Sequence, residues 1–148
     1  LHLSLRRQRQ MCIRDSNIAE LMENGLNIDE VCDVLSGYLE AFIKAMPTGK
    51  QNTFANRTLP CFTYVTIRED QPINMAGAFE KAVTGNGKGY EKDSIDAFLE
   101  YTKKVYENYA EYPKKSFVVC LDDVNTEAER VKMKDLARLV EKEIRNYN

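Results

Sequence analysis

Residues 27–67 read NIDEVCDVLSGYLEAFIKAMPTGKQNTFANRTLPCFTYVTI, and this stretch predicts one helix and one strand. Its first half predicts a helix over Asn27–Met46, because apolar residues recur there at helical intervals. Asn27 and Glu30 have the spacing of a capping box, which favours a helix start at this point. Pro47 and Gly49 then end the helix.

The end of the same stretch, Cys61–Ile67, predicts a strand because it is rich in β-branched and aromatic side chains. A second strand is expected over Ser116–Leu121, where a nearly continuous apolar run favours burial. Shorter helical turns are expected within residues 17–26 and around Met75–Phe79.

Two further helices are predicted in the second half of the chain. The first spans Asp93–Tyr112, with Asp93 as its cap and Pro113 directly after it. The second begins at a capping box formed by Thr126 and Glu129 and continues to about Arg145. The fold class is therefore α+β, with two clear strands and three main helices. Because two strands alone make a marginal sheet, we interpret the chain as part of a larger sheet domain.

Residues 1–16, LHLSLRRQRQMCIRDS, differ from the rest of the chain and show no helical or strand periodicity. The string RRQRQMCIRDS resembles translated sequencing adapter. We therefore expect an artefactual, disordered leader, followed by residues 17–148 as the C-terminal portion of a single domain. The alternative is a genuine basic arm that binds nucleic acid.

The charge is unevenly distributed along the chain. Lys and Arg total 21 and Asp and Glu total 23, for a net charge of −2. Without residues 1–16 the net charge is −5. Yet residues 41–68 contain no acidic residue and hold four cations, namely Lys44, Lys50, Arg57 and Arg68. This basic island indicates that any contact with a polyanion is local.

Several functional classes lack their signals. The single histidine, His2, lies in the leader, and Cys32, Cys61 and Cys120 are scattered without a C-x-x-C motif. We therefore expect no metal site, no cofactor and no catalytic activity. Reduced cysteines and the absence of a long apolar run favour a cytoplasmic protein with no membrane segment.

The loop over residues 47–57 carries the strongest chemical signal. It offers backbone N–H groups and the side chains of Lys50, Gln51, Asn52, Thr53, Phe54 and Arg57. Such groups hold a phosphodiester backbone and stack an exposed base. The alternative is a polar connecting loop, in which Lys50 complements the helix dipole and Phe54 packs inward.

Three other groupings have two interpretations each. The turn over residues 85–89, with Lys88, could approach a phosphate or be a flexible surface turn. Asp122 and Asp123 could hold a divalent metal or belong to a solvated loop. Four tyrosines form either a stacking platform or half-buried packing; they are Tyr101, Tyr106, Tyr109 and Tyr112.

Residues 45–55, AMPTGKQNTFA, resemble a segment of the CasC family, the backbone subunits of the type I-E CRISPR Cascade complex. The resemblance continues through residues 68–75 (REDQPINM) and 77–83 (GAFEKAV) and spans roughly Asn17–Val124. It implies an RRM-like (ferredoxin-like) palm domain, of which this chain would supply the C-terminal part and a helical extension.

The resemblance also implies a function. Such subunits assemble head to tail as copies along a CRISPR guide RNA, hold its sugar–phosphate backbone, and leave the bases free to recognise target DNA in antiviral defence. Other Cascade subunits complete the complex, and the backbone subunit is no nuclease. Lys50, Gln51 and Thr53 would contact RNA, with Asn52, Phe54 and Arg57 beside them and Lys88 as a further candidate.

Two other functional hypotheses stay open at this point. One is a metal-dependent nuclease that cleaves target RNA with Asp122 and Asp123. The other is a plain α+β interaction module without any role in RNA binding.

Overall fold

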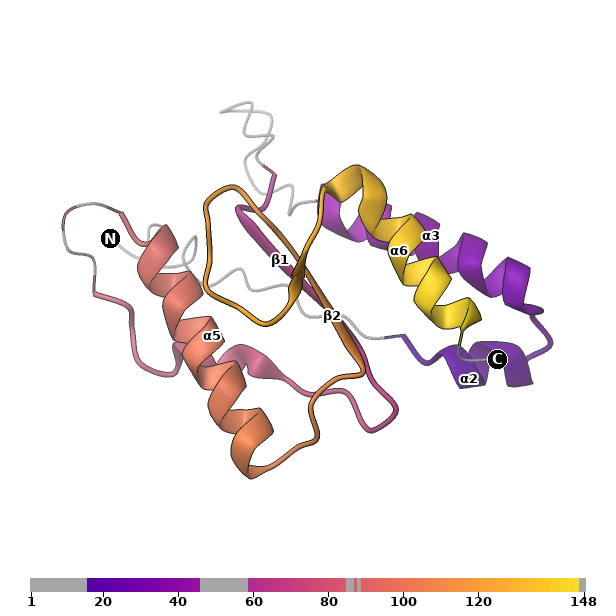
Figure 1. Ribbon diagram of the computed structural model, residues 1–148, viewed down its shortest axis with the longest axis horizontal. Helices are drawn as coiled ribbons and strands as arrows, with labels where there is room; N and C mark the ends of the chain where they lie inside the picture. Colours follow the sequence, from indigo (N-terminus) through magenta and orange to yellow (C-terminus); the bar gives the residue numbers. More distant parts are fainter. Residues whose placement is uncertain (1–15, 46–58, 85–86, 88, 147–148) are drawn as a thin grey trace. The chain divides into compact units, whose positions relative to one another are not determined.

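The computed structural model describes residues 16–45, 59–84, 87 and 89–146. The chain divides into two compact units. The sheet unit comprises Asn17–Ile67 together with the chain from Lys115 onward, and the helical unit comprises Arg68–Lys114. Figure 1 shows the elements of both units along the sequence.

The sheet unit begins with two helices joined by a tight turn. Helix α2 spans Ile18–Glu23 and helix α3 spans Ile28–Lys44. Gly25 between them has φ 97°, a left-handed conformation that glycine adopts without a Cβ penalty. The predicted capping box at the start of α3 is confirmed, because Asn27 Oδ1 accepts from Glu30 N and Glu30 Oε2 accepts from Asn27 N.

In the part of the chain that the structure describes, three strands form one sheet in the order β1-β2-β3. Strand β1 spans Phe62–Ile67, β2 spans Lys115–Cys120 and β3 spans Glu129–Arg130. β1 and β2 are antiparallel, with Phe62 opposite Cys120 and Ile67 opposite Lys115, whereas β2 and β3 are parallel. The two strands that the sequence predicts are thus confirmed, and β3 is an addition.

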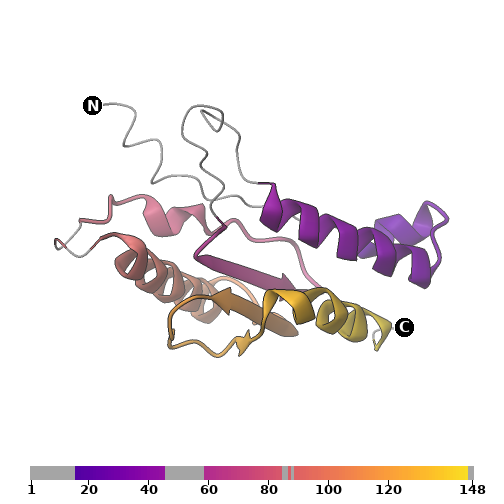
Figure 2. The same cartoon turned by 90° about the horizontal axis from the view of Figure 1, so that it is seen from above.

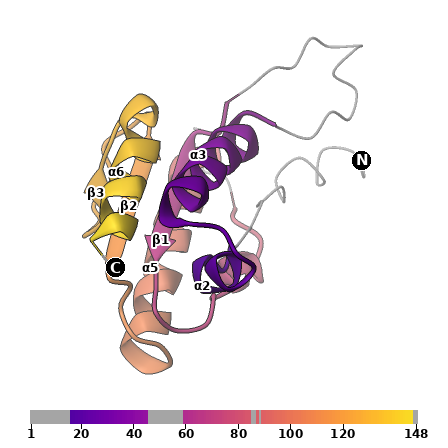
Figure 3. The same ribbon diagram turned by 90° about the vertical axis from the view of Figure 1, so that its right-hand side faces the viewer.

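The core of the sheet unit lies between α3, the sheet and the last helix, α6, which spans Met133–Arg145. α3 and α6 lie side by side (Figure 3). Their apolar faces bury a cluster that includes one residue of β2; the buried members are Val31, Cys32, Leu35, Ile43, Phe117, Leu136, Val140 and Ile144. Burial raises the pKa of the Cys32 thiol, consistent with a reduced packing residue.

The predicted start of the last helix is wrong. Thr126 forms no capping box, because its hydroxyl accepts from the nearby Ala128 N instead. Glu129 and Arg130 are extended and pair with β2, and α6 begins only at Met133 without a side-chain cap. A 2.7 Å ion pair between Lys115 and Glu129 links the two strands. Tertiary pairing therefore overrides the local capping signal.

In the helical unit, the 3₁₀ helix η1, Met75–Phe79, lies alongside helix α5, Glu91–Asn108 (Figure 2). The sequence predicts both elements, and the residues expected for η1 are the ones observed. Asn74 caps η1 by accepting from Ala76 N at 2.8 Å. The buried side chains of this unit come mainly from one face of α5; they are Met75, Ile95, Phe98, Thr102 and Tyr106.

The predicted bounds and cap of α5 need correction. Tyr90 is the N-cap residue and makes no side-chain cap bond, so Asp93 lies inside the first turn and is not the cap. A negative side chain in the first turn still stabilises the helix through its interaction with the positive end of the helix dipole. The helix ends at Asn108, because the N–H groups of Tyr109 and Ala110 both point to Val105 O. The segment before Pro113 then leaves the helix.

The α+β fold class is confirmed. Among the described residues, no helix combines the length and apolar character needed to cross a bilayer.

Candidate functional site

The loop predicted to bind RNA lies outside the described residues, which omit 46–58. Its candidate contacts therefore stay predictions: Lys50, Gln51, Asn52, Thr53, Phe54 and Arg57. The structure does describe the two elements that the loop joins. α3 ends with Ala45 as its C-cap, and Leu59 and Pro60 lead into β1. Both elements belong to the sheet unit, so the loop begins and ends on one scaffold.

Lys44, the first cation of the basic island, lies in the last turn of α3. Its ammonium group pairs with the Glu40 carboxylate one turn earlier, and this pairing lowers the pKa of Glu40. Both side chains are largely exposed. Because an exposed pair of this kind is weak, Lys44 can exchange its partner for another anion at little cost.

Arg68, the last cation of the basic island, is held by protein groups. Its Nε and Nη2 atoms donate to the two carboxylate oxygens of Asp70 at 2.6 Å, and Nη2 also donates to Glu111 O. Its guanidinium carbon lies 5.2 Å from the ring centroid of Tyr106, and its side chain is only 7% exposed. Arg68 is therefore a structural residue, and the cations available at the loop reduce to Lys44, Lys50 and Arg57.

Lys88, the last predicted contact, also lies outside the described residues. Its two neighbours are described: Gly87 has φ 83° and Gly89 has φ 100°. Both values favour glycine, so the turn depends on this residue type at two positions. Contact between Lys88 and a phosphate stays a prediction.

The aspartates of the nuclease hypothesis occupy the loop after β2. Asp123 forms an ion pair with Arg130 of β3, while Cys120 Sγ lies 3.1 Å from the backbone oxygen of Asp122. Across the described parts of the chain, no three His, Cys, Asp or Glu side chains gather as metal ligands do. Asp123 thus has a cationic side chain as its partner at this position.

The four tyrosines do not behave as one group. Tyr101 is half-buried against η1 and Tyr106 is 8% exposed, as packing residues are. Tyr109 is 91% exposed and Tyr112 is 51% exposed. Packing therefore explains Tyr101 and Tyr106, and the ring contact between Tyr112 and Tyr106 explains part of the burial of Tyr112, whereas Tyr109 is not explained by packing.

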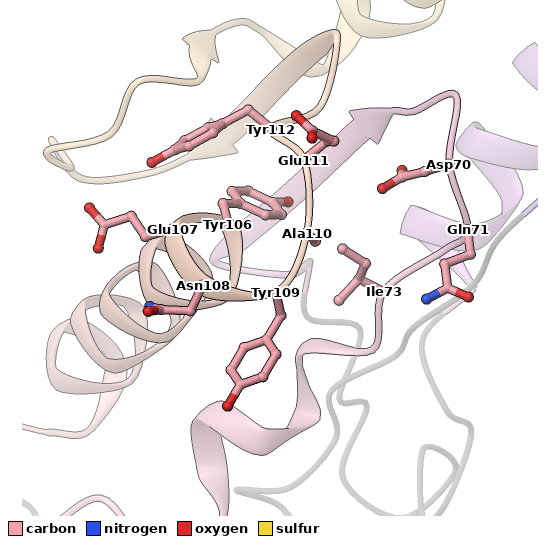
Figure 4. Close-up of a pocket in the computed structure, with 10 residues that line it drawn as sticks. All are labelled: Asp70, Gln71, Ile73, Tyr106, Glu107, Asn108, Tyr109, Ala110, Glu111 and Tyr112. Carbon is pink, nitrogen blue, oxygen red and sulfur yellow. The ribbon is translucent and has the colours of Figure 1, made fainter.

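Tyr106, Tyr109 and Tyr112 line an open groove in the helical unit, called here the tyrosine groove (Figure 4). Its volume is about 460 Å³. The remaining lining residues come from the segment after β1 and from the end of α5; they are Asp70, Gln71, Ile73, Glu107, Asn108, Ala110 and Glu111. The sequence showed the tyrosine spacing, but the contribution of Asp70 depends on tertiary structure that no local pattern reports.

Two solved structures of proteins from RNA-guided complexes are similar to this chain. The chain aligns with a protein of a "CRISPR RNA-guided surveillance complex, pre-nicking" at a TM-score of 0.77 and 25% identity, covering 86% of this chain and 39% of that one. A second match, from a "CRISPR RNA-guided surveillance complex", has a TM-score of 0.74 and 24% identity, covering 89% and 50%. The chain therefore spans half or less of the length of these two proteins.

The family match is more specific. The CT1975-like protein family matches residues 15–142, and the chain belongs to this CRISPR-associated family. No curated protein matches the sequence.

Proposed function

We propose that the chain is a non-catalytic, guide-RNA-binding backbone subunit of a type I-E Cascade complex in the cytoplasm. It holds the sugar–phosphate backbone of the CRISPR guide RNA, so that the bases can recognise target DNA in antiviral defence. Its partners are copies of itself in a head-to-tail filament and the other Cascade subunits. The observation that carries this proposal is the similarity, over 86% of the chain, to a protein of an RNA-guided surveillance complex.

The proposed contact is the loop between α3 and β1. The loop carries Lys50 and Arg57 and no acidic residue, whereas the rest of the chain is acidic. Amide and hydroxyl groups at Gln51, Asn52 and Thr53 suit phosphate and sugar oxygens, which carry no sequence information. A guide holder must accept any spacer sequence, so contacts of this kind fit the proposed function better than a base-reading groove.

The test compares the 148-residue chain with its Lys50→Ala, Arg57→Ala double variant. Binding of a labelled single-stranded RNA is followed by fluorescence anisotropy across a salt series. Each lost phosphate contact on a single strand should lower the slope of log K against log salt by about 0.7, so the double variant should lose about 1.4.

A matched control removes two exposed cations elsewhere. Lys134→Ala with Arg138→Ala changes the net charge equally but lies on α6. We expect this variant to keep the slope of the unmodified chain. An equal loss of slope in both double variants would mean that RNA binding depends only on the net charge of the chain, and the loop assignment would fail.

The proposal assigns no chemical step to this chain. The nuclease hypothesis is tested by incubating the chain with magnesium and a target RNA complementary to the guide. Intact RNA is the expected result. Cleavage that Asp122→Ala abolishes would replace the proposed function with a catalytic one.

A further inference from the structure

The tyrosine groove is not used by the proposed RNA contact and lies entirely within the helical unit. One side comes from Asp70, Gln71 and Ile73, and the other comes from the last turn of α5 and the segment that follows it. Figure 4 shows the side chains from these two segments around the groove. Its chemistry can therefore be judged separately from the loop between α3 and β1.

Aromatic rings provide the first part of this chemistry. The rings of Tyr106 and Tyr112 lie 5.3 Å apart between centroids at an interplanar angle of 52°. Arg68 already occupies one position over Tyr106, at 5.2 Å. The ring of Tyr109 is 91% exposed, so it offers a π face that the chain leaves uncovered. Faces of this kind attract ammonium and guanidinium groups.

Negative charge provides the second part. Three lining residues are acidic, namely Asp70, Glu107 and Glu111, and none of the lining residues is Lys or Arg. Arg68 neutralises Asp70, and Lys103 lies 3.8 Å from Glu107. No ion pair is formed by the Glu111 carboxylate among the described residues. The C-terminal end of α5, which has no basic residue in its last turn, adds partial negative charge.

We propose that the tyrosine groove binds an arginine- or lysine-containing segment of a partner protein. A cationic side chain placed over Tyr109 or Tyr112 meets a ring face, and the Glu111 carboxylate adds negative charge to the lining of the same groove. The helical unit shows the same combination internally, where Arg68 contacts Tyr106, Asp70 and the backbone oxygen of Glu111. The groove is thus complementary in charge to a basic peptide.

The geometry favours a peptide over other cationic or aromatic-binding partners. Nucleic acid would bring phosphates towards Glu107 and Glu111, which repel them. A small cation would leave the ring of Tyr109 mostly in solvent, whereas an extended segment covers the ring and reaches the acidic residues together. This interaction surface is independent of the guide RNA, so it extends the proposed function without resting on it.

The test titrates the 148-residue chain with a glycine–arginine repeat peptide and follows tyrosine side-chain resonances by NMR. The same peptide with citrulline in place of arginine is the uncharged control. We expect the arginine peptide to shift the resonances of Tyr109 and Tyr112, and the citrulline peptide to bind at least fivefold more weakly, since both the cation–π and the ionic contacts are lost.

Variants of the chain separate the groove from general charge attraction. Tyr109→Ala and Glu111→Gln should each weaken arginine-peptide binding about two- to fivefold. Tyr90→Ala removes an exposed tyrosine, and Asp96→Asn removes an exposed acid, both outside the groove, so neither should change the affinity. Far-UV circular dichroism verifies that each variant keeps its helices.

Three outcomes would overturn the proposal. They are equal binding of the citrulline peptide, equal weakening by the groove variants and their controls, and perturbation of the groove tyrosines by polyuridylate instead of the peptide. The Lys50→Ala, Arg57→Ala variant should bind the peptide normally, which distinguishes failure of this inference from failure of the proposed RNA contact.

Discussion

Arg68 and Asp70 are joined by two parallel hydrogen bonds of 2.6 Å, one from Nε to Oδ1 and the other from Nη2 to Oδ2. The same guanidinium donates to Glu111 O, which lies 43 residues further along the chain. A single planar side chain therefore ties the beginning of the helical unit to the segment that follows α5. Only a guanidinium supplies the fork geometry that this arrangement uses.

Replacing Arg68 with lysine should destabilise the chain although the charge is kept. An ammonium group cannot form the bidentate contact with Asp70 and reach Glu111 O together. We expect a loss of about 1.5–3 kcal/mol, the usual range for hydrogen bonds to charged groups. Urea unfolding followed by circular dichroism measures the loss. The matched control is Lys92→Arg at an exposed position of α5, which should be neutral.

The same pair predicts a pH dependence. The hydrogen bonds that Arg68 donates hold the pKa of Asp70 below its ordinary value of 3.8. A carboxylate with a lowered folded-state pKa stabilises the fold above about pH 4, and this contribution disappears as the pH falls through the folded value. Arg68→Gln should therefore reduce the loss of stability below pH 4. The measurement is the urea midpoint of both proteins between pH 2.5 and pH 6. An equal loss of stability in both proteins as the pH falls below 4 would contradict the prediction.

Local signals explain which elements the sequence could predict. The capping box of Asn27 and Glu30 involves residues three apart, and η1 follows a short cap at Asn74, so both are readable from neighbours in sequence. Strand β3 contains only Glu129 and Arg130, which carry no apolar alternation. Its existence depends on pairing with β2, a contact that no local pattern reports.

Gly77 is a position where packing excludes a side chain. A Cβ atom there would lie 2.3 Å from Tyr101 Oη and 2.7 Å from Tyr101 Cζ. Gly77→Ala should therefore displace the Tyr101 side chain or push η1 away from α5, and destabilise the chain by about 1–3 kcal/mol. Tyr101→Leu in the same background should recover part of the loss, as a double-mutant cycle in urea would measure.

Gly37 is the matched control for that experiment. It lies on an exposed face of α3, and a Cβ there would meet no atom within 4 Å. Gly37→Ala should stabilise the chain by about 0.5–1 kcal/mol, because alanine loses less backbone entropy in a helix. Equal changes in the free energy of unfolding for both alanine variants would contradict the prediction, because they would show that the contact with Tyr101 does not require glycine at position 77.

The two capping boxes suggested by the sequence provide another comparison. Asn27 Oδ1 accepts from the backbone N–H groups of Asp29 and Glu30, both at 3.0 Å, so Asn27→Ala should cost about 1 kcal/mol. Thr126 caps no helix, and its hydroxyl accepts only from Ala128 N at 3.2 Å, so Thr126→Ala should cost less than Asn27→Ala, about 0.5 kcal/mol. Urea unfolding of both variants is the measurement, and a larger loss for Thr126→Ala would contradict the observed start of α6.

The candidate sites differ in how far sequence could predict them. The loop proposed to bind RNA is contiguous in sequence, so its composition can be read directly, and its contacts stay predictions because residues 46–58 lie outside the described residues. The role of Arg68 could not be read in the same way. Its partners Asp70, Tyr106 and Glu111 come from segments that only folding brings together. Sequence alone therefore could not show that this cation of the basic island has a structural role.

Two leucines that the sequence places in predicted apolar elements should differ greatly in how much their truncation destabilises the chain. Leu136 lies within the last helix that the sequence predicts, and Leu121 is the last residue of the predicted second strand. Leu136 is 1% exposed within the core of the sheet unit, whereas Leu121 lies just beyond β2 and is 77% exposed. Leu136→Ala should cost about 2–5 kcal/mol, because it removes apolar contacts and leaves a cavity. Leu121→Ala should change the free energy of unfolding by less than about 0.5 kcal/mol, and comparable losses in urea unfolding would mean that Leu121 is covered in solution.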